Sequence, residues 1–183
     1  MDLRGFEPVS RCLDAFTAEG STGKLPQRST KNSAGYDFYA FEDITIPSHL
    51  KHLMKIVENI SDEEKWITPF AKVENEWIIP YCIKTGVKAY MQDDEVLQLY
   101  IRSSAPSKLG LVMANSVGII DSDYYDNPDN EGEIGFLVYN LTASPVTIHK
   151  GEKIGQAVFT KFLKADNDNV TKERVGGYGS TGA

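Results

Sequence analysis

Asp121 is the carboxylate whose sequence surroundings best suit chemistry. It directly follows the apolar residues VGII in the run NSVGIIDSDYY (115–125), so it is predicted to end a buried strand. A carboxylate there would be partly desolvated and could be held ready as a general base. Further acidic residues follow it at Asp123, Asp126, Asp129, Glu131 and Glu133. An EF-hand calcium loop is excluded, because the positions that need Gly and Glu hold Asp126 and Gly132, and a solvated acidic loop fits 126–131 instead.

A second candidate lies in YIRSSAPSKLG, where Arg102 is predicted to end another strand. Ser103, Ser104 and a proline-containing turn follow it. A guanidinium, hydroxyls and exposed turn amides are the groups that bind phosphate oxygens. A surface turn with a salt-bridged arginine is the alternative interpretation.

The third candidate is the glycine-rich segment RVGGYGSTGA, which carries Arg174 and Tyr178 and then Ser180 and Thr181. It is not a Walker A loop, because no lysine follows the glycines. Glycines let main-chain amides approach a phosphate closely, and a ring on such a segment can stack on a flat ligand. A frayed terminus is the alternative.

Other catalytic or metal-binding patterns are weak. His49 and His52 share a predicted helix face but have no third ligand, so a metal site is not expected there. Cys12 and Cys82 lack metal-type spacing and are predicted to be free thiols in a reducing cytosol. His149 lies beside a turn and is predicted to be exposed.

The composition limits the classes of function. The chain has 183 residues, 41% of them hydrophobic, with a net charge of −7 and a pI near 5.0. This length and hydrophobic content suit a single hydrophobic core. An acidic surface disfavours direct nucleic-acid binding. The sequence shows neither a secretory signal nor about eighteen consecutive apolar residues, so we expect no membrane association and a cytoplasmic location, in the host if the gene belongs to a phage.

Short strands between turn signals must position these groups. They are predicted in SAGYDFYA (33–40), TGVKAYM (85–91), EVLQLYI (95–101), EIGFLVYNLT (133–142) and twice in SPVTIHKGEKIGQAVFTKFL (144–163), where KGEK turns the chain. This pattern predicts a single all-β domain over residues 1–183, as a sandwich or a barrel.

One segment differs from this pattern. Its apolar residues Leu50, Leu53, Met54, Val57 and Ile60 have the spacing of an amphipathic helix. Ser61 and Glu64 then have capping-box spacing before Trp66. We therefore expect a small helical insertion over about 48–80, which together with Trp77 suggests a surface for a protein partner. A C-terminal arm is expected over about 172–183.

Five segments occur in an order that resembles the motifs of the trimeric dUTP diphosphatases (dUTPases): AGYDFYA (34–40), RSS (102–104), NSVGIIDSDYY (115–125), GEKIGQ (151–156) and RVGGYGSTG (174–182). The run DYY…NPDNEG is similar to phage and prophage members from Gram-positive bacteria. The resemblance extends from about residue 20 to the end. It implies a jelly-roll-like (β-clip) subunit, a homotrimer with sites at its interfaces, and Mg²⁺-dependent hydrolysis of dUTP to dUMP and pyrophosphate.

The resemblance also implies roles for single residues. Asp121 would activate the water that attacks the α-phosphorus and would contact the sugar 3′-hydroxyl. Phosphates would be bound by Arg102, Ser103, Ser104, Gln156, Arg174, Ser180 and Thr181. Asp37 would reach Mg²⁺ through water. Tyr124 would lie beneath the deoxyribose and exclude a 2′-hydroxyl, and the uracil would be contacted by Asn115, Gly118, Ile119 and Tyr178. The arm would cross onto a neighbouring subunit and close over the nucleotide.

The chain departs from the family pattern in two places within these motifs. Arg174 and Tyr178 are one residue closer than is usual, and Gly155 replaces the usual alanine, which we interpret as a packing variant. Two alternatives stay open. A dCTP deaminase shares the fold, although IIDSDYY disfavours it, and a dUTPase-fold regulator would bind a protein through residues 48–80.

Overall fold

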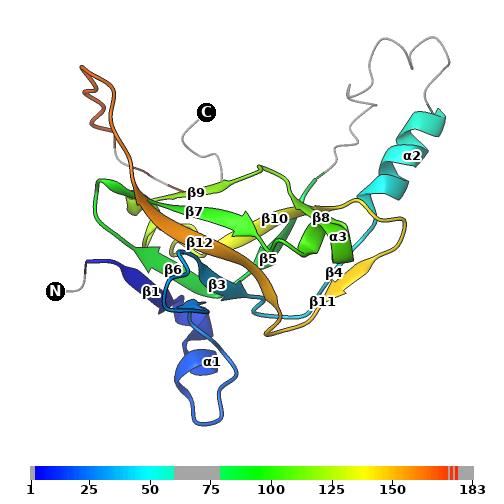
Figure 1. The fold of residues 1–183 in the computed structure, drawn as a ribbon, viewed down its shortest axis with the longest axis horizontal. Helices are drawn as coiled ribbons and strands as arrows, with labels where there is room; N and C mark the ends of the chain where they lie inside the picture. The colour runs from blue at the N-terminus through cyan, green and yellow to red at the C-terminus, as the bar shows by residue number, and fades with distance from the viewer. Residues whose placement is uncertain (1–2, 60–78, 173, 175, 177–183) are drawn as a thin grey trace.

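The computed structural model describes residues 3–59, 79–172, 174 and 176 (Figure 1). The strands are β1 Gly5–Pro8, β2 Gln27–Arg28, β3 Tyr36–Tyr39, β4 Ile44–Ile46, β5 Tyr81–Lys84, β6 Val87–Tyr90, β7 Glu95–Ile101, β8 Leu111–Met113, β9 Gly118–Asp121, β10 Gly135–Asn140, β11 Val146–Ile148 and β12 Lys153–Lys161. The helices are α1 Leu13–Thr17, α2 His49–Asn59 and α3 Ala105–Leu109, with 3-10 turns η1 Ser10–Cys12 and η3 Ser122–Tyr124. No helix among these residues is long and apolar enough to cross a membrane.

Two sheets pack against each other to form the core. The larger has the strand order β2-β3-β12-β7-β9 and the smaller β5-β10-β8, and two further pairs are β1-β6 and β11-β4. Phe38 of the larger sheet and Phe136 of the smaller are almost fully buried, with ring centroids 5.8 Å apart. The described strands form open sheets and no closed barrel. The expected all-β, jelly-roll-like fold is therefore confirmed as a sandwich.

Strand β7 positions the candidate site, and it has the bounds predicted from EVLQLYI. It runs antiparallel to both of its neighbours, β12 and β9, with Leu97 and Leu99 buried in the core. Asp121, the last residue of β9, pairs with Val96 near the start of β7, whereas α3 lies beyond its other end (Figure 1). Because a strand rises about 3.3 Å per residue, Val96 and Arg102 are about 20 Å apart along β7.

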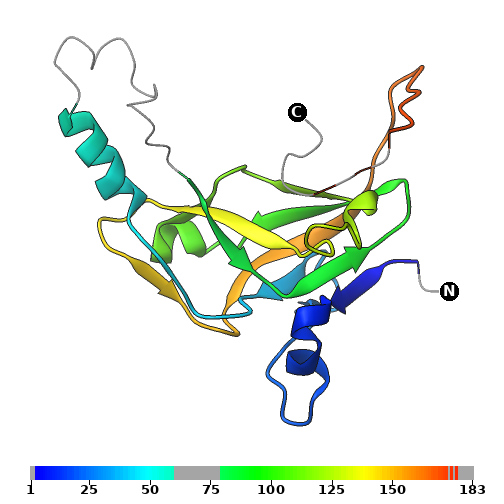
Figure 2. The same ribbon diagram turned by 180° about the vertical axis from the view of Figure 1, so that it is seen from behind.

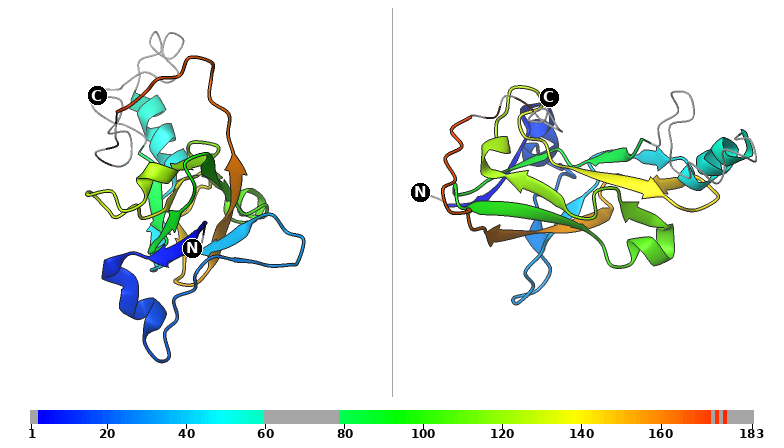
Figure 3. Two further views of the ribbon diagram at one scale, coloured as in Figure 1. Left: turned by 90° about the vertical axis from the view of Figure 1, so that its left-hand side faces the viewer. Right: turned by 90° about the horizontal axis from the view of Figure 1, so that it is seen from above.

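The predicted helix is present as α2, which projects from the sheets at the end of the molecule away from β1 (Figures 2 and 3). His49, at its start, is buried. Its Nδ1 accepts a hydrogen bond from the Asn140 main-chain N–H at 2.9 Å, and its Nε2 lies 3.0 Å from the Ile79 carbonyl oxygen. Both ring nitrogens are therefore used within the protein, in a neutral ring that donates from Nε2. The segment that holds Ser61, Glu64, Trp66 and Trp77 lies outside the described residues.

The cysteines and His149 are placed as the sequence predicts. Cys12 is buried, Cys82 is half-buried, and both are free thiols. Burial raises the pKa of the Cys12 thiol and so makes it a poor nucleophile. The His149 side chain is 65% exposed beside the turn between β11 and β12.

Candidate functional site

One group of predicted site residues gathers at one end of the larger sheet. We call this group the Arg102 cluster; its members are Asp37, Arg102, Ser103, Ser104 and Gln156. Asp37 on β3 is the register partner of Gln156 on β12. Strand β12 also pairs with β7, whose end carries Arg102, and the Arg102 Nη1 lies 3.4 Å from the Lys153 carbonyl oxygen that accepts its hydrogen bond. Three adjacent strands thus bring together residues that are far apart in the sequence.

Three cations lie in or beside the Arg102 cluster. They line a cavity of about 270 Å³ whose other walls are mostly apolar and include Glu152; the cations are Arg102 and also Lys108 and Lys153, which the sequence analysis missed. The Lys153 Nζ donates to the Asp37 carboxylate at 2.5 Å and to the Ser29 hydroxyl at 3.2 Å. Partial burial would raise the pKa of Asp37, but the hydrogen bonds from Lys153 and Ser29 outweigh it and hold the pKa below its usual value. The three cations suit the binding of a polyphosphate.

A second group lies along β9 and the turns on either side of it. We call it the Asp121 cluster; its members are Asn115, Gly118, Ile119, Asp121 and Tyr124. Gly118 is buried, and a Cβ there would lie 3.0 Å from a β7 side chain, so glycine permits the close approach of β9 to β7. Asn115 and Ile119 are exposed and Tyr124 is buried. Asp121 ends its strand as predicted, but the expected desolvation is wrong for the single chain, because its side chain is 50% exposed.

Arg174 covers the Asp121 cluster from the C-terminal arm. Its Nη2 lies 2.5 Å from the Asp121 carboxylate and its Nε lies 2.7 Å from that of Asp123, and these contacts raise the Arg174 pKa. The guanidinium carbon is 5.8 Å from the centre of the Tyr124 ring. Arg174 thus contacts its own chain, through a partner, Asp123, that the sequence analysis missed. Tyr178, Ser180 and Thr181 lie outside the described residues.

A single chain keeps the two clusters apart. Arg102 follows one end of β7, whereas Asp121 pairs with Val96 near the other end, about 20 Å away along the strand. A small ligand bound at one cluster would therefore not reach the other cluster of the same chain.

The donor groups limit how a metal would be held. Among the described residues, no three His, Cys, Asp or Glu side chains are grouped so that they could hold a metal ion. Asp37 offers one ionised carboxylate, which Lys153 and Ser29 already contact. This arrangement fits Mg²⁺ that brings its own water and phosphate ligands, since Mg²⁺ dehydrates reluctantly.

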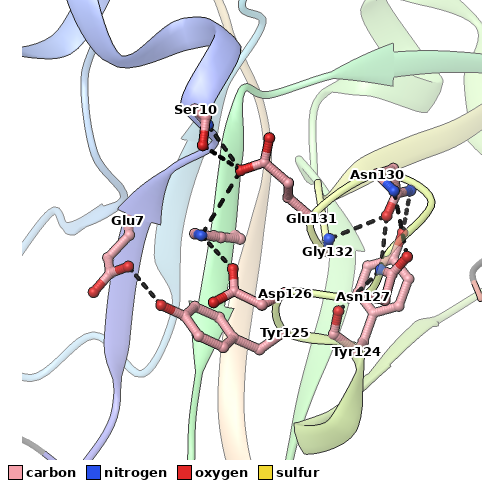
Figure 4. Close-up of polar contacts among 10 residues, drawn as sticks. Glu7, Ser10, Tyr124, Tyr125, Asp126, Asn127, Asn130, Glu131 and Gly132 are labelled. Atoms are coloured by element: carbon pink, nitrogen blue, oxygen red, sulfur yellow. Dashed lines mark hydrogen bonds and ion pairs between the residues drawn. The ribbon is translucent and has the colours of Figure 1, made fainter. Parts of the chain in front are cut away.

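The acidic side chains of the loop 126–132 are exposed, as predicted for a solvated loop, but the loop is also fastened to the protein (Figure 4). Lys88 on β6 forms an ion pair with Asp126 and lies 3.9 Å from the Glu131 carboxylate. That carboxylate accepts hydrogen bonds from Ser10, at 2.9 Å from the main-chain N–H and 2.7 Å from the hydroxyl. The loop thus joins the N-terminal segment to the segment that carries Tyr124.

The chain is similar to known dUTPases. A family model described as dUTPase matches residues 73–182. The deoxyuridine 5′-triphosphate nucleotidohydrolase of Lactococcus lactis is 43% identical over the full length of both chains. The crystal structure of the dUTPase from Streptococcus mutans matches with a TM-score of 0.65 and 37% identity, over 89% of this chain and 99% of that one. A mutant dUTPase from phage phi11 of S. aureus, described as coordinating a structural Mg(II) ion, shares the fold at 17% identity, with a TM-score of 0.57 over 93% and 98% of the two chains.

Proposed function

Because the chain belongs to the dUTPase family, we propose that it hydrolyses dUTP to dUMP and pyrophosphate, which keeps uracil out of DNA. The observation that carries the proposal is the Asp121 cluster. There an accessible carboxylate ends β9 three residues before the buried ring of Tyr124. A carboxylate at a rigid strand end, next to a ring, can orient a water against one face of a bound nucleotide.

In this proposal Asp121 holds and activates the water that attacks the α-phosphorus. The reaction depends mainly on positioning and on neutralising charge. Arg102, Ser103, Ser104 and Gln156 bind the phosphates, which agrees with the cations around that cluster. Mg²⁺ bound by the triphosphate supplies further positive charge, and Asp37 would hold its water ligands.

Substrate choice is assigned to the other members of the Asp121 cluster. The Tyr124 ring lies beneath the deoxyribose and leaves no room for a 2′-hydroxyl, so ribonucleotides are rejected by a clash. Asn115 and the main chain at Gly118 and Ile119 contact the uracil edge. Hydrogen-bonding groups set for uracil are left unpaired against cytosine, which is a strong source of discrimination.

We propose that the protein is a homotrimer in which neighbouring copies complete each site. The separation of the two clusters along β7 supports this proposal. Nucleotide binding would then require Arg174 to leave Asp121 and Tyr124, because it covers both in the single chain. The arm would close over a neighbouring copy's nucleotide as a lid, with Arg174, Ser180 and Thr181 on phosphates and Tyr178 on the uracil.

Pyrophosphate release from dUTP, dCTP, dTTP and UTP, each measured with Mg²⁺, tests the proposal. We expect rapid release from dUTP and little from the other three. Equal release from all four would contradict the assigned uracil and sugar contacts. Release of ammonia from dCTP would support the deaminase alternative instead.

A second role is favoured by the exposed apolar residues of α2. Leu50 and Met54 are 38% and 54% exposed on a helix that projects from the body. Exposed apolar side chains grouped on one element are typical of protein-binding surfaces. We propose that a protein partner contacts the 48–80 segment. If it does, changing both residues to Ser should abolish capture of the partner while dUTP hydrolysis is retained.

A further inference from the structure

We propose that Asn127 and Asn130 form a brace that fixes the position of Tyr124 and thereby sets the discrimination between deoxyribo- and ribonucleotides. This inference rests on the proposed function, in which Tyr124 lies beneath the deoxyribose. Both asparagines belong to the loop 126–132, and neither is among the site residues predicted from the sequence.

Asn130 fixes the hydroxyl end of the Tyr124 ring (Figure 4). The Asn130 Nδ2 donates to the Tyr124 Oη at 2.8 Å, and that Oη donates to the Glu133 carbonyl at 3.2 Å. The phenol therefore uses both its donor and an acceptor position within the protein. With only 6% of the residue exposed, water cannot readily replace these bonds.

Asn127 fixes the main chain of Tyr124 and holds Asn130 in place. Its Nδ2 donates to the Tyr124 carbonyl at 3.0 Å and to the Asn130 Oδ1 at 2.7 Å. Its Oδ1 accepts from the N–H groups of Asp129 at 3.1 Å and Asn130 at 3.3 Å. Asn127 is 5% exposed and uses all four of its hydrogen-bonding positions. A buried network that is fully satisfied in this way is rigid.

The backbone of the loop is shaped to reach Tyr124. Asp126 and Glu131 adopt left-handed conformations with φ of 55° and 58°, and Gly132 has φ of 78°. A Cβ on Gly132 would clash with the Tyr124 carbonyl oxygen. The Gly132 N–H also donates to the Asn130 Oδ1 at 3.1 Å. The loop therefore passes directly against the residue that it braces.

Sugar discrimination requires this rigidity. A ring can exclude a single hydroxyl only if its position is held to within about 0.5 Å, because a small tilt would open enough space. Without the Asn130 amide, the Tyr124 hydroxyl loses its shorter hydrogen bond while the 3.2 Å bond to Glu133 remains, and the ring can tilt about its other end.

The test compares kcat/KM for dUTP and UTP in the full-length protein. Asn130→Ala should lower the dUTP-to-UTP ratio about tenfold, mainly by raising kcat/KM for UTP, because the loss of one buried hydrogen bond corresponds to roughly that factor. Asn140→Ala is the matched control. Asn140 is fully buried, and its Nδ2 donates to the carbonyls of Ile46 at 3.0 Å and Ser144 at 2.8 Å, away from the loop. The Asn140→Ala variant should lower Tm and leave the dUTP-to-UTP ratio of kcat/KM unchanged.

Two further variants separate the possible outcomes. Tyr124→Ala should abolish the discrimination. If Tyr124→Ala abolishes the discrimination while Asn130→Ala keeps the parent dUTP-to-UTP ratio, the proposal that the two asparagines act as a brace is wrong. The proposed function would still stand. If the parent chain does not hydrolyse dUTP, the proposed function itself fails. Should Asn130→Ala not fold, Tyr124→Phe removes both hydrogen bonds of the hydroxyl, to Asn130 and to Glu133, and keeps the ring, and an unchanged ratio in that variant also overturns the brace.

Discussion

Asp121 is the residue on which the proposed chemistry depends most. Asp121→Asn keeps the shape of the side chain and removes the charge that would activate water. We expect kcat to fall by about 10²–10⁴, which is the usual contribution of general acid–base catalysis. Binding of a non-hydrolysable dUTP analogue, measured by calorimetry, should change little. Hydrolysis at the parent rate would disprove the assigned role.

Adding a single methyl group at Gly155 tests how tightly the core is packed there. A Cβ at this position would clash with the Phe136 ring and would lie 2.6 Å from the Tyr100 carbonyl oxygen. Gly155→Ala should therefore lower the free energy of unfolding by about 1–3 kcal/mol, the usual cost of overpacking a core. Urea denaturation would measure this change.

A companion variant identifies the source of the strain at Gly155. Phe136→Leu makes room beside the new methyl group, so the double variant should lose less stability than the two single variants added together. Strict additivity would show that the Phe136 ring is not the obstacle. The contact supports the interpretation of Gly155 as a packing variant.

The site residues found from the sequence are those that lie in ordered motifs. Asp37, Arg102 and Gln156 are about 50 to 120 residues apart, and adjacent strands bring them together as expected. Asp123, although it lies within such a motif, and Lys88 were missed because their partners, Arg174 and Asp126, are distant in the sequence. Sequence spacing indicates that a charged residue is present but not which opposite charge it meets.

At the scale of elements, the strength of the periodic signal decides what is predictable. Helix α2 is long enough to show a clear hydrophobic period and β7 is a compact β-rich run, and both are confirmed. Helices α1 and α3 have five residues each, too few for such a signal. Helix α3 did carry other signals, since Pro106 lies in its first turn and Gly110 ends it with φ of 62°.

The N-terminal segment is tied to β7 by an ion pair that should make stability depend on pH. The Arg4 Nε lies 3.0 Å from both oxygens of the Glu95 carboxylate, which is 4% exposed as a residue. The hydrogen bond from Arg4 holds the pKa of Glu95 below its usual value. The resulting stabilisation is complete above the unfolded-state pKa and is lost as the pH falls through the folded-state pKa.

Glu95→Gln should therefore have a lower Tm than the parent at pH 7. The difference should shrink as the pH drops below about 4.3, the ordinary glutamate value. Asp94→Asn is the matched control, because Asp94 pairs with Lys161 at a site where the two side chains are 54% and 70% exposed, and such pairs contribute little. A Tm difference that stays constant from pH 7 to pH 3 would show that the Arg4–Glu95 pair is not its source.

At the scale of the whole molecule, mixed assemblies test the shared sites. Chains with Asp121→Asn and chains with Arg102→Ala would be refolded together in equal amounts. If neighbouring copies supply the two residues, each is intact with probability one half, so about a quarter of the sites are complete. Pyrophosphate release should return to about that fraction of the parent rate. If one chain supplied both residues, no mixture would recover activity.

The length of β7 also governs which substitutions can compensate for one another. If each site is shared between copies as proposed, residues that meet at one nucleotide but belong to different copies are encoded by the same gene, at positions about 20 Å apart along a single strand. Among related sequences, correlated changes between the surroundings of Asp121 and of Arg102 would therefore mark contacts between molecules. Treated as contacts within one chain, they would require β7 to fold back on itself, which its continuous seven-residue pairing with β12 does not allow.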